Sequence, residues 1–326
     1  MKILVTGGAG YIGSFMTKRL LEREDEVVVV DSLERGHKEA VDPKAKFIQG
    51  NLLDDSFVES IFQNEKFDAV INFAGFIAMG ESMENPFMYF QNNVFSSLKI
   101  LEQMVKTGSN NFIFSSSAGV YGNPVKLPIP EDHPKNPENP YGESKLMVEK
   151  IMKWYFETKK INTAALRYFN ASGASLDATR GENHTPESHL IPNIIKALLE
   201  NRTFNLFGDD YKTKDGTCVR DYIHVLDLVE AHLLAIDKLK KSPGNYAFNV
   251  GTGNGFSNKE VVEMVEKVSG RQVNIQISPR RPGDADELVA DSTKIKSELG
   301  FTPKYSDLET IVKTAWEWHS KNDKET

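Results

Sequence analysis

A tyrosine and a lysine spaced four residues apart could do chemistry together in this sequence. Tyr141 and Lys145 lie in the stretch NPYGESK, directly after Asn139 and Pro140. Pro140 suits the first turn of a helix and Asn139 can cap it, so the pair should share one helix face. An ammonium group beside a phenol favours the phenolate, which would make Tyr141 a usable base near neutral pH. A plain surface pair on an amphipathic helix is the alternative that the spacing alone leaves open.

Three consecutive serines could bring hydroxyl groups to the same place. Ser115, Ser116 and Ser117 follow the apolar run NFIF, so they stand at the carboxyl end of an expected strand. Ligands of open α/β sheets bind at this end of the strands. We therefore predict that the hydroxyl of Ser117 bridges a substrate oxygen and Tyr141. One of the serines could instead cap a helix.

Three glycines follow the first apolar run and open an expected helix. Gly7, Gly10 and Gly13 lie in VTGGAGYIGS, and glycine there permits a tight turn and close approach of the backbone to a pyrophosphate. Asp31, which is 18 residues past Gly13, ends the second apolar run. Its carboxylate can accept a hydrogen bond from a ribose 2′-hydroxyl and would repel a 2′-phosphate. The pattern predicts NAD rather than NADP, although Arg35 is close enough to leave NADP open.

Short apolar runs alternate with longer helical patterns along the first half of the chain. The runs are almost continuously apolar, which is typical of strands buried on both faces of a parallel sheet. We expect strands at residues 2–6, 27–30, 46–49, 68–74, 111–116, 163–169 and 246–250, and helices at 189–200 and 259–268. The alternation predicts an α/β fold with a doubly wound, Rossmann-type parallel sheet and right-handed crossovers.

The pattern loosens after residue 170, which suggests a second region. Residues 171–187 and 207–217 are polar and are expected to form loops. We predict a Rossmann domain for NAD at residues 1–170 and a smaller, mixed α/β substrate domain at 171–326. The chain is expected to return to the first domain around residues 218–250.

Composition excludes several classes of protein. The 326 residues carry a net charge of -7 with no basic run, so a nucleic-acid partner is not expected. No apolar segment approaches the roughly 20 residues of a membrane span. The single cysteine fits a reducing compartment. We expect a soluble, cytoplasmic protein.

The glycine turn, Asp31, the serines and the Tyr-x-x-x-Lys pair occur in the order found in the extended short-chain dehydrogenase/reductase superfamily. Within it, the whole chain resembles the UDP-glucose 4-epimerase family. The matching stretches are TGGAGYIGS, FAGFIAMGES, NNVFSSLKILE, FIFSSSAGVYG, PYGESKLMVE, LRYFNASGA, DGTCVRDYIHVLDL and PRRPGD. RYFN, DGTCVRDYIHV and PRRPGD are the more specific of these, because the glycine turn and the Tyr-x-x-x-Lys pair occur in many sugar-nucleotide enzymes.

The resemblance and the motifs together give three sets of expected site residues. The catalytic set is Ser117, Tyr141 and Lys145. The NAD set is Gly7, Gly10, Tyr11, Ile12, Gly13, Asp31, Asn51, Leu52, Phe73, Ala74, Gly75, Asn92, Ser115, Tyr141, Lys145 and Phe169. The set for a UDP-sugar is Ser117, Tyr141, Asn170, His189, Leu190, Arg220, Arg281, Asp284 and Leu288. Within it, the two arginines are implied to grip the diphosphate and Asp284 to contact the uridine ribose.

The reaction implied by the resemblance is the 4-epimerisation of UDP-hexoses, UDP-glucose to UDP-galactose and back. Tyr141 would take the proton of the 4-hydroxyl while the C4 hydride passes to NAD, giving a transient 4-keto sugar. Ala118 and Gly119 follow Ser117, where the related dehydratases carry an acidic pair, so elimination of water is not expected. Epimerisation of UDP-N-acetylhexosamines, UDP-pentoses or UDP-uronates stays open, as does a non-catalytic NAD-binding scaffold.

The chain departs from the family pattern at four of these positions. Ile77 stands where the best-known members have lysine, and Asn51 replaces the usual aspartate near adenine, although a plain turn explains an asparagine there equally well. Gly119 stands in place of threonine or alanine. His189 stands where many members have asparagine, and we expect it to cap a helix or touch the diphosphate.

Leu288 is expected to set substrate breadth. Several members restricted to glucose and galactose have a tyrosine at this position, whose ring fills the space beside the C2 substituent. Leucine is shorter, so we predict weaker but detectable activity on the N-acetylated substrates. The alternative is that Leu288 is only a core residue.

The histidines predict no metal site, because no two of them form a helical pair with a nearby acid.

The remaining expectation concerns assembly. The resemblance implies a homodimer formed through the helices that contain residues 92–106 and 141–157.

Overall fold

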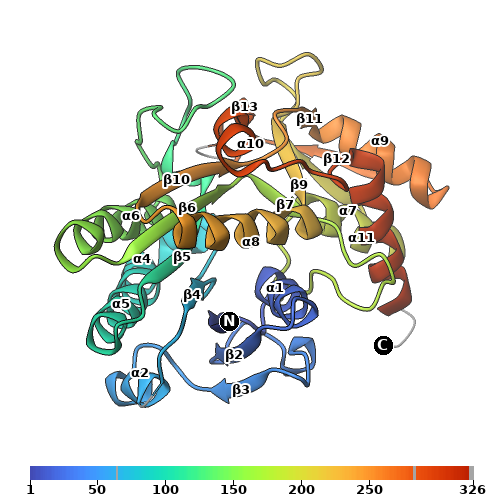
Figure 1. Cartoon of the computed structure of the whole chain (residues 1–326). Helices are drawn as coiled ribbons and strands as arrows, with labels where there is room; N and C mark the ends of the chain where they lie inside the picture. The colour runs from blue at the N-terminus through green and yellow to red at the C-terminus, as the bar shows by residue number, and fades with distance from the viewer. Residues whose placement is uncertain (64, 282–283, 323–326) are drawn as a thin grey trace.

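A seven-stranded parallel sheet runs through the protein (Figure 1). The computed structural model describes residues 1–63, 65–281 and 284–322. The strand order across the sheet is β3-β2-β1-β4-β5-β6-β10. The strands are β1 (Lys2–Thr6), β2 (Glu26–Asp31), β3 (Lys46–Gln49), β4 (Ala69–Asn72), β5 (Asn111–Ser117), β6 (Asn162–Tyr168) and β10 (Asn245–Val250). All seven overlap the apolar runs that predicted them.

Helices cover both faces of this sheet, which explains why the strands are apolar throughout. Ile3 and Val5 of β1 pack into one core with side chains of α1 and α8, whereas Leu4 packs into a second core on the opposite face with α2, α5 and α6. These helices are α1 (Tyr11–Glu22), α2 (Asp55–Phe62), α5 (Ser96–Thr107), α6 (Pro140–Lys159) and α8 (Val225–Lys241). The sheet is therefore doubly wound, as predicted.

Short helical segments fill the crossovers between the strands. Five of them occur before residue 121, and the turn at 118–120 follows directly on β5. They are η1 (Lys38–Ala40), α3 (Met79–Glu84), α4 (Pro86–Phe90), η2 (Gln91–Phe95) and η3 (Ala118–Val120). Residues of α3, η2 and η3 line the pocket at the carboxyl ends of the strands.

A second, smaller region of mixed α/β structure lies beside these carboxyl ends (Figure 1). Its core joins side chains from three helices and two strands, including Ile194, Tyr222, Val261 and Ile311. Its strands are β7 (Asn170–Ser172), β8 (Phe204–Phe207), β9 (Val219–His224), β11 (Gly255–Ser257), β12 (Ile275–Ser278) and β13 (Glu287–Leu288). Its helices are α7 (Leu190–Leu199), α9 (Asn258–Ser269) and α11 (Leu308–Asn322), while α10 (Thr293–Leu299) packs near β10 and α8.

The predicted fold class is confirmed, but strands β8, β11, β12 and β13 of the smaller region were not predicted. Strand β7 lies where the sequence predicted the start of a polar loop, and β9, which pairs with β7 and β11, was not predicted. Strand β10 returns to the large sheet and pairs with β6. The division into domains at residues 1–170 and 171–326 stays a prediction. Among the described residues, no helix combines the length and apolar character that crossing a membrane requires.

Candidate active site

A large pocket lies along the carboxyl edge of the large sheet, between that edge and the smaller region. Its cavity volume is about 500 Å³. It is lined by most of the predicted site residues: Gly7, Gly10, Tyr11, Ile12, Gly13, Asp31, Asn51, Leu52, Phe73, Ala74, Gly75, Asn92, Ser115, Ser117, Tyr141, Phe169, Asn170, His189, Arg220, Asp284 and Leu288. Residues spread from position 7 to position 288 therefore meet in one cavity.

The glycine turn has the geometry that a pyrophosphate requires. Gly7 adopts a φ of +71°, and a Cβ placed on Gly13 would lie 2.2 Å from the carbonyl oxygen of Gly7. Side chains are thus excluded at both positions by the backbone itself. Gly10 precedes the first turn of α1, and no side-chain cap from the described residues occupies that helix terminus. The N–H groups of this helix terminus face the pocket, so the glycine turn fits the diphosphate of a dinucleotide.

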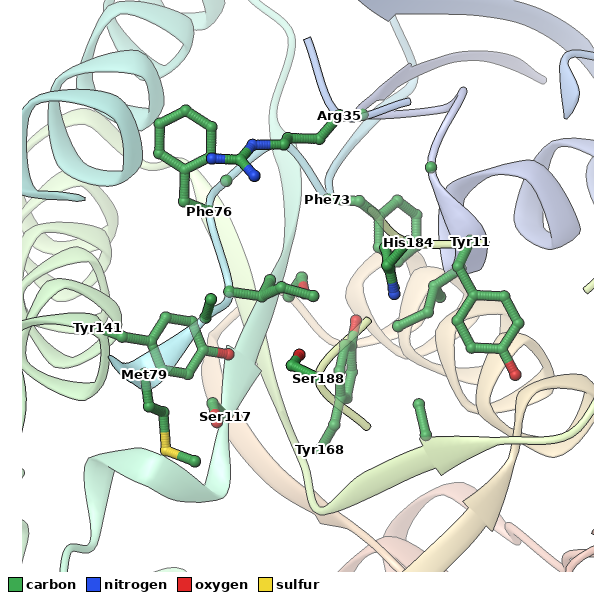
Figure 2. Close-up of a pocket in the computed structure, with 18 of the residues that line it drawn as sticks. Tyr11, Arg35, Phe73, Phe76, Met79, Ser117, Tyr141, Tyr168, His184 and Ser188 are labelled. Atoms are coloured by element: carbon green, nitrogen blue, oxygen red, sulfur yellow. The ribbon is translucent and has the colours of Figure 1, made fainter. Parts of the chain in front are cut away.

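Asp31 is held at the end of β2 by two backbone amides. Its Oδ2 accepts from the N–H of Ala9 at 3.0 Å, and its Oδ1 accepts from the N–H of Leu33 at 2.8 Å. A carboxylate can accept about four hydrogen bonds, so acceptor capacity remains for ribose hydroxyls. Arg35 is not free to bind a 2′-phosphate, because its guanidinium binds Glu81 at 2.7 Å and lies against the ring of Phe76 (Figure 2).

Tyr141 is placed by the start of helix α6, as the sequence predicts. Asn139 accepts a hydrogen bond from the N–H of Gly142 at 2.9 Å, and the helix begins at Pro140. A Cβ on Gly142 would lie 2.5 Å from the carbonyl oxygen of Gly119, so the residue after the tyrosine must be small for η3 and α6 to approach. Figure 2 shows the phenol of Tyr141 on the same side of the pocket as Ser117.

Burial controls the acidity of this phenol. Burial raises the pKa of Tyr141, while its hydrogen bond with Ser117 acts in the opposite direction. Ser117 also accepts a hydrogen bond from the N–H of Gly119 at 3.0 Å, which fixes the hydroxyl beside Tyr141. Lys145 is not among the groups that shift this pKa, and the penalty of burying the phenolate dominates. The role of Lys145 in tuning the phenol stays a prediction.

Lys145 lies behind the pocket wall rather than in it. Its side chain is buried, and Nζ donates to the carbonyl oxygen of Ser115 at 2.7 Å. Nζ is 5.8 Å from the centroid of the Tyr141 ring. Burial lowers the pKa of Lys145 to about 7. The helical pairing of the two residues is confirmed, but the ammonium group does not contact the phenol directly.

Arg220 and Asp284 form the polar wall at the other end of the pocket. Their side chains approach to 3.4 Å, and Nη1 of Arg220 also donates to the carbonyl oxygens of Val219 and Ala285 at 2.9 Å each. Asp221, the alternative partner suggested by the sequence, is instead buried and accepts from the N–H groups near residue 252. Arg220 is therefore held by Asp284 and two backbone carbonyls rather than by Asp221, and it lines the cavity.

Leu288 lies beside Arg220 on the neighbouring strand. The two residues are paired in the β13–β9 register, and Leu288 packs against a small buried cluster that includes Ala118 and Tyr121. It also lines the pocket. The side chain is thus both a packing residue and a wall residue, so the two readings of the sequence are compatible.

Three predicted residues do not line the cavity within the described part of the chain: Lys145, Leu190 and Arg281. Arg281 is exposed, and its guanidinium lies over the ring of Phe207 at 4.2 Å. Leu190 is the first residue of α7. Pro282 and Gly283, which belong to the predicted PRRPGD motif, lie outside the described residues.

The side chains of His189 and Asn51 both contact residues close to them in the sequence. His189 precedes α7, but among the described residues its side chain accepts no capping hydrogen bond, so the capping prediction is wrong. Its ring contacts Glu182 and Glu187 instead. Burial opposes protonation, yet these two carboxylates outweigh it and raise the pKa of His189 to about 10. Asn51 accepts from the N–H of Leu53 at 2.8 Å, which is the local turn considered above.

Several lining residues were missed by sequence reasoning. Tyr168 is the aromatic residue before Phe169 in RYFN, and its hydroxyl pairs with His232. Glu182 and His184 come from the polar loop, where two glutamates and two histidines within eight residues were the available signal. A helical spacing rule could not detect them, because loop residues follow no fixed period.

An open parallel sheet with a glycine turn at β1, an acid at the end of β2 and a serine–tyrosine pair at β5 and α6 is the architecture of NAD-dependent enzymes of the extended short-chain dehydrogenase/reductase type. The comparisons agree. A family model described as GDP-mannose 4,6 dehydratase matches residues 4–314. The UDP-glucose 4-epimerase of Lactobacillus helveticus is 49% identical over 325 residues, covering 99% of this chain and 98% of that protein.

Solved structures show the same relationship. A UDP-glucose 4-epimerase from Brucella ovis in complex with NAD is 44% identical, with a TM-score of 0.93 and 97% of each chain covered. The UDP-Glc/GlcNAc 4-epimerase of Campylobacter jejuni is 42% identical, with a TM-score of 0.85, covering 98% of this chain and 99% of that one. The chain belongs to the UDP-glucose 4-epimerase family.

Proposed function

We propose that this protein is an NAD-dependent isomerase that interconverts UDP-glucose and UDP-galactose. The observation that carries the proposal is the continuity of the pocket. One cavity joins the glycine turn and Asp31 at one end to Arg220 and Asp284 at the other, with Tyr141 between them. A dinucleotide and a UDP-sugar can therefore meet at the phenol.

The protein's own groups handle the proton of the sugar hydroxyl. Bound NAD would take the hydride from C4 and give it back. Tyr141 accepts the proton of the 4-hydroxyl and returns it, and Ser117 holds both the phenol and the substrate oxygen by hydrogen bonds. The buried site excludes water, which protects the 4-keto sugar while it turns between the two hydride transfers.

The residues after Ser117 separate this reaction from dehydration. The matched family model takes its description from a 4,6-dehydratase. The resemblance described above implies that dehydratases of this superfamily carry an acidic pair at this place. Here Ala118 and Gly119 follow Ser117, and neither has a side chain that can donate or accept a proton. A Cβ on Gly119 would lie 3.3 Å from the Ser117 hydroxyl, so an acidic side chain would crowd the serine.

The remaining site assignments form part of the proposal. The residues around the glycine turn, Asp31 and Asn92 bind NAD, and Lys145 supports this end through Ser115. Arg220, Arg281 and Asp284 bind the UDP moiety, since arginine makes bidentate contacts with phosphate oxygens. Arg281 reaches the diphosphate by leaving the ring of Phe207, a rotation that its exposed position permits.

Substrate breadth at C2 is a second part of the proposal. Leu288 lines the pocket beside Ala118, and a leucine leaves more room there than the tyrosine ring of restricted relatives. The Campylobacter jejuni relative is named for both glucose and N-acetylglucosamine substrates. We propose that the protein accepts UDP-N-acetylhexosamines at a lower rate than UDP-hexoses.

The proposal includes a cytoplasmic homodimer. Several large apolar side chains are exposed on the two helical segments that the family resemblance places in a dimer interface. Phe95 is 53% exposed at the end of η2, and Met147 and Trp154 are 37% and 62% exposed on α6. A second copy of the chain would bury them. The cytoplasmic location rests on the single free cysteine, Cys218.

A panel of UDP-sugars tests the reaction directly. Purified protein should interconvert UDP-glucose and UDP-galactose without added NAD and without net formation of NADH. UDP-N-acetylglucosamine, UDP-xylose and UDP-glucuronate complete the panel. Preferred turnover of a pentose or a uronate would move the proposal to that substrate, and no turnover of any member would overturn it.

A further inference from the structure

Two glutamates and two histidines meet in the loop between β7 and α7. Glu182, His184, Glu187 and His189 each offer one ligand atom, and these four atoms all lie within 4.8 Å of one another. Nδ1 of His189 is 2.6 Å from Glu182 Oε1 and 3.2 Å from Glu187 Oε1. Nδ1 of His184 is 3.0 Å and 3.9 Å from the same two oxygens. Both rings thus direct the same nitrogen at the same pair of carboxylates.

The two carboxylates are buried, and one oxygen of Glu187 lacks a hydrogen bond among the described residues. The side chains of Glu182 and Glu187 are each 4% exposed. Oε2 of Glu187 has no hydrogen-bond partner in the described part of the chain, and the ammonium of Lys196 is 3.8 Å from it. The ion pair with Lys196 offsets part of the cost of burying this oxygen, and a cation held by the four residues would offset more of it.

We propose that these four residues bind one divalent transition-metal ion, for which Zn²⁺ is the best fit. Zinc takes imidazole nitrogen and carboxylate oxygen in four-coordinate sites with bonds of about 2.0–2.2 Å. Such a tetrahedron has ligand atoms about 3.3 Å apart. The four nitrogen–oxygen distances, from 2.6 to 3.9 Å, fall on both sides of this value. Small rotations of the rings would equalise them.

Charge balance also suits a divalent cation. Two carboxylates carry a charge of about -2, which either two protonated imidazoles or one metal ion can neutralise. In the metal form both histidines are neutral ligands. The bonds to the ion then fix the positions of the four side chains, which two protonated imidazoles would not do. Sequence reasoning predicted no metal, since it looked for histidines on a helix. Here a loop turn, rather than a helix face, brings the nitrogens together.

The ion would fix a loop that forms part of the pocket wall. Glu182, His184 and His189 line the cavity. The indole of Trp318 on α11 donates to the carbonyl oxygen of Glu182 at 3.1 Å, so the loop is attached on its far side as well. A metal would therefore tie this wall to the start of α7. This inference concerns the loop alone and does not depend on the proposed reaction.

Cobalt provides a probe that reads the site itself. Full-length protein stripped with dipicolinate should bind one Co²⁺ per chain, with the intense visible bands of a four-coordinate nitrogen–oxygen site, and Zn²⁺ should displace it. His184→Ala and Glu187→Gln should each weaken Co²⁺ binding more than about 100-fold, since losing even an outer partner of a metal ligand costs about 10–100-fold. Zn²⁺ should raise the Tm of the wild type but not of either variant.

A matched control separates the cluster from its surroundings. Nε2 of His37 contacts the carbonyl oxygen of Asn183 in the same loop, yet His37 offers no ligand to the cluster. His37→Ala should keep wild-type Co²⁺ affinity. The proposal is overturned if the stripped wild type binds no Co²⁺ at micromolar concentrations. A thiolate charge-transfer band, which would assign the ion to Cys218, or unchanged binding in both cluster variants would overturn it equally.

Discussion

The ammonium group of Lys145 donates a hydrogen bond to the backbone carbonyl of Ser115, 2.7 Å away. Ser115 belongs to the strand that carries Ser117, so the lysine ties helix α6 to the end of β5. The bond directs the ammonium group at the backbone, and Nζ lies 5.8 Å from the centroid of the Tyr141 ring. Lys145 therefore joins α6 to β5 next to the proposed catalytic residues, and burying its ammonium group costs free energy.

The burial of Lys145 predicts a pH-dependent stability. Burial lowers its pKa from the usual 10.5 to about 7, so between these values the unfolded chain binds the proton and the folded chain does not. The lysine's destabilising effect is complete below about pH 7 and fades as the pH rises toward 10.5. Lys145→Met should therefore unfold at higher urea concentration than the wild type near pH 6, with a gap that closes toward about pH 10.

A lysine on the exposed side of the same helix is the control for this measurement. Lys150 is exposed, so the stability difference between Lys150→Met and the wild type should not vary with pH over this range. A constant gap between Lys145→Met and the wild type across the series would show that the buried ammonium is not the cause.

Tyr141→Phe should remove turnover while leaving binding intact. The variant loses only the hydroxyl that accepts the substrate proton, and loss of a general base typically costs about 10²–10⁴-fold in kcat. The bound NAD content and the Kd for UDP should stay near wild-type values. Initial rates with UDP-galactose provide the measurement, and a variant that retains wild-type kcat would refute the role of the phenol.

Arg220→Met should weaken the binding of UDP. A hydrogen bond to a charged group contributes about 1.5–3 kcal/mol, so the Kd measured by calorimetry should rise about 10–100-fold. Arg280→Met is the matched control, because Arg280 pairs with Asp210 and does not line the pocket among the described residues. Equal effects of the two substitutions would argue against a specific contact by Arg220.

Leu288→Tyr should narrow the range of substrates. The larger ring would fill the pocket beside the C2 substituent, so turnover of UDP-N-acetylglucosamine should fall while that of UDP-glucose stays within a few-fold. Comparing kcat/KM for the two substrates isolates the effect from general damage to the site. A wild type that ignores the N-acetylated substrate, or a variant that turns it over unchanged, would show that another residue sets the limit.

Trp154→Glu should convert the proposed dimer to a monomer. A charged side chain at a buried interface position opposes association strongly, whereas the folded monomer tolerates it because the tryptophan is 62% exposed. Light scattering after size-exclusion chromatography gives the mass. Leu176→Glu, at a residue 56% exposed in a loop, should leave the mass unchanged. A monomeric wild type would refute the dimer.

Much of the fold was predictable because burial on two faces leaves a local trace in the sequence. The run at residues 2–6 has three consecutive buried apolar residues at positions 3–5, and it forms β1. Strand β9 left no such trace, since Arg220 and Asp221 interrupt it. The burial of Asp221 depends on hydrogen bonds from Thr252, Gly253 and Ala290, which are distant in sequence. Only the folded chain brings these partners to the strand.

The site divides in the same way. The glycine turn, Asp31 and Tyr141 were predictable, because their geometry depends on a few neighbouring residues. The direct partner of Lys145 was not predictable, since the backbone acceptor that a buried amine binds depends on how the chain packs around it. The cluster around Glu182 depends on the path of an irregular loop, and no periodicity encodes such a path.

Strand β10 completes the large sheet from a point late in the chain. It pairs with β6 through Asn245 and Thr163, and the chain between them forms β7, β8, β9, α7 and α8. Long-range pairing of this kind is slow compared with local helix formation, because the loop must close before the contacts form. A nascent chain that ends before residue 245 has β6 as an open edge, which is a template for pairing with other chains. The cofactor-binding half therefore cannot finish folding on the ribosome until much of the other half has been synthesised.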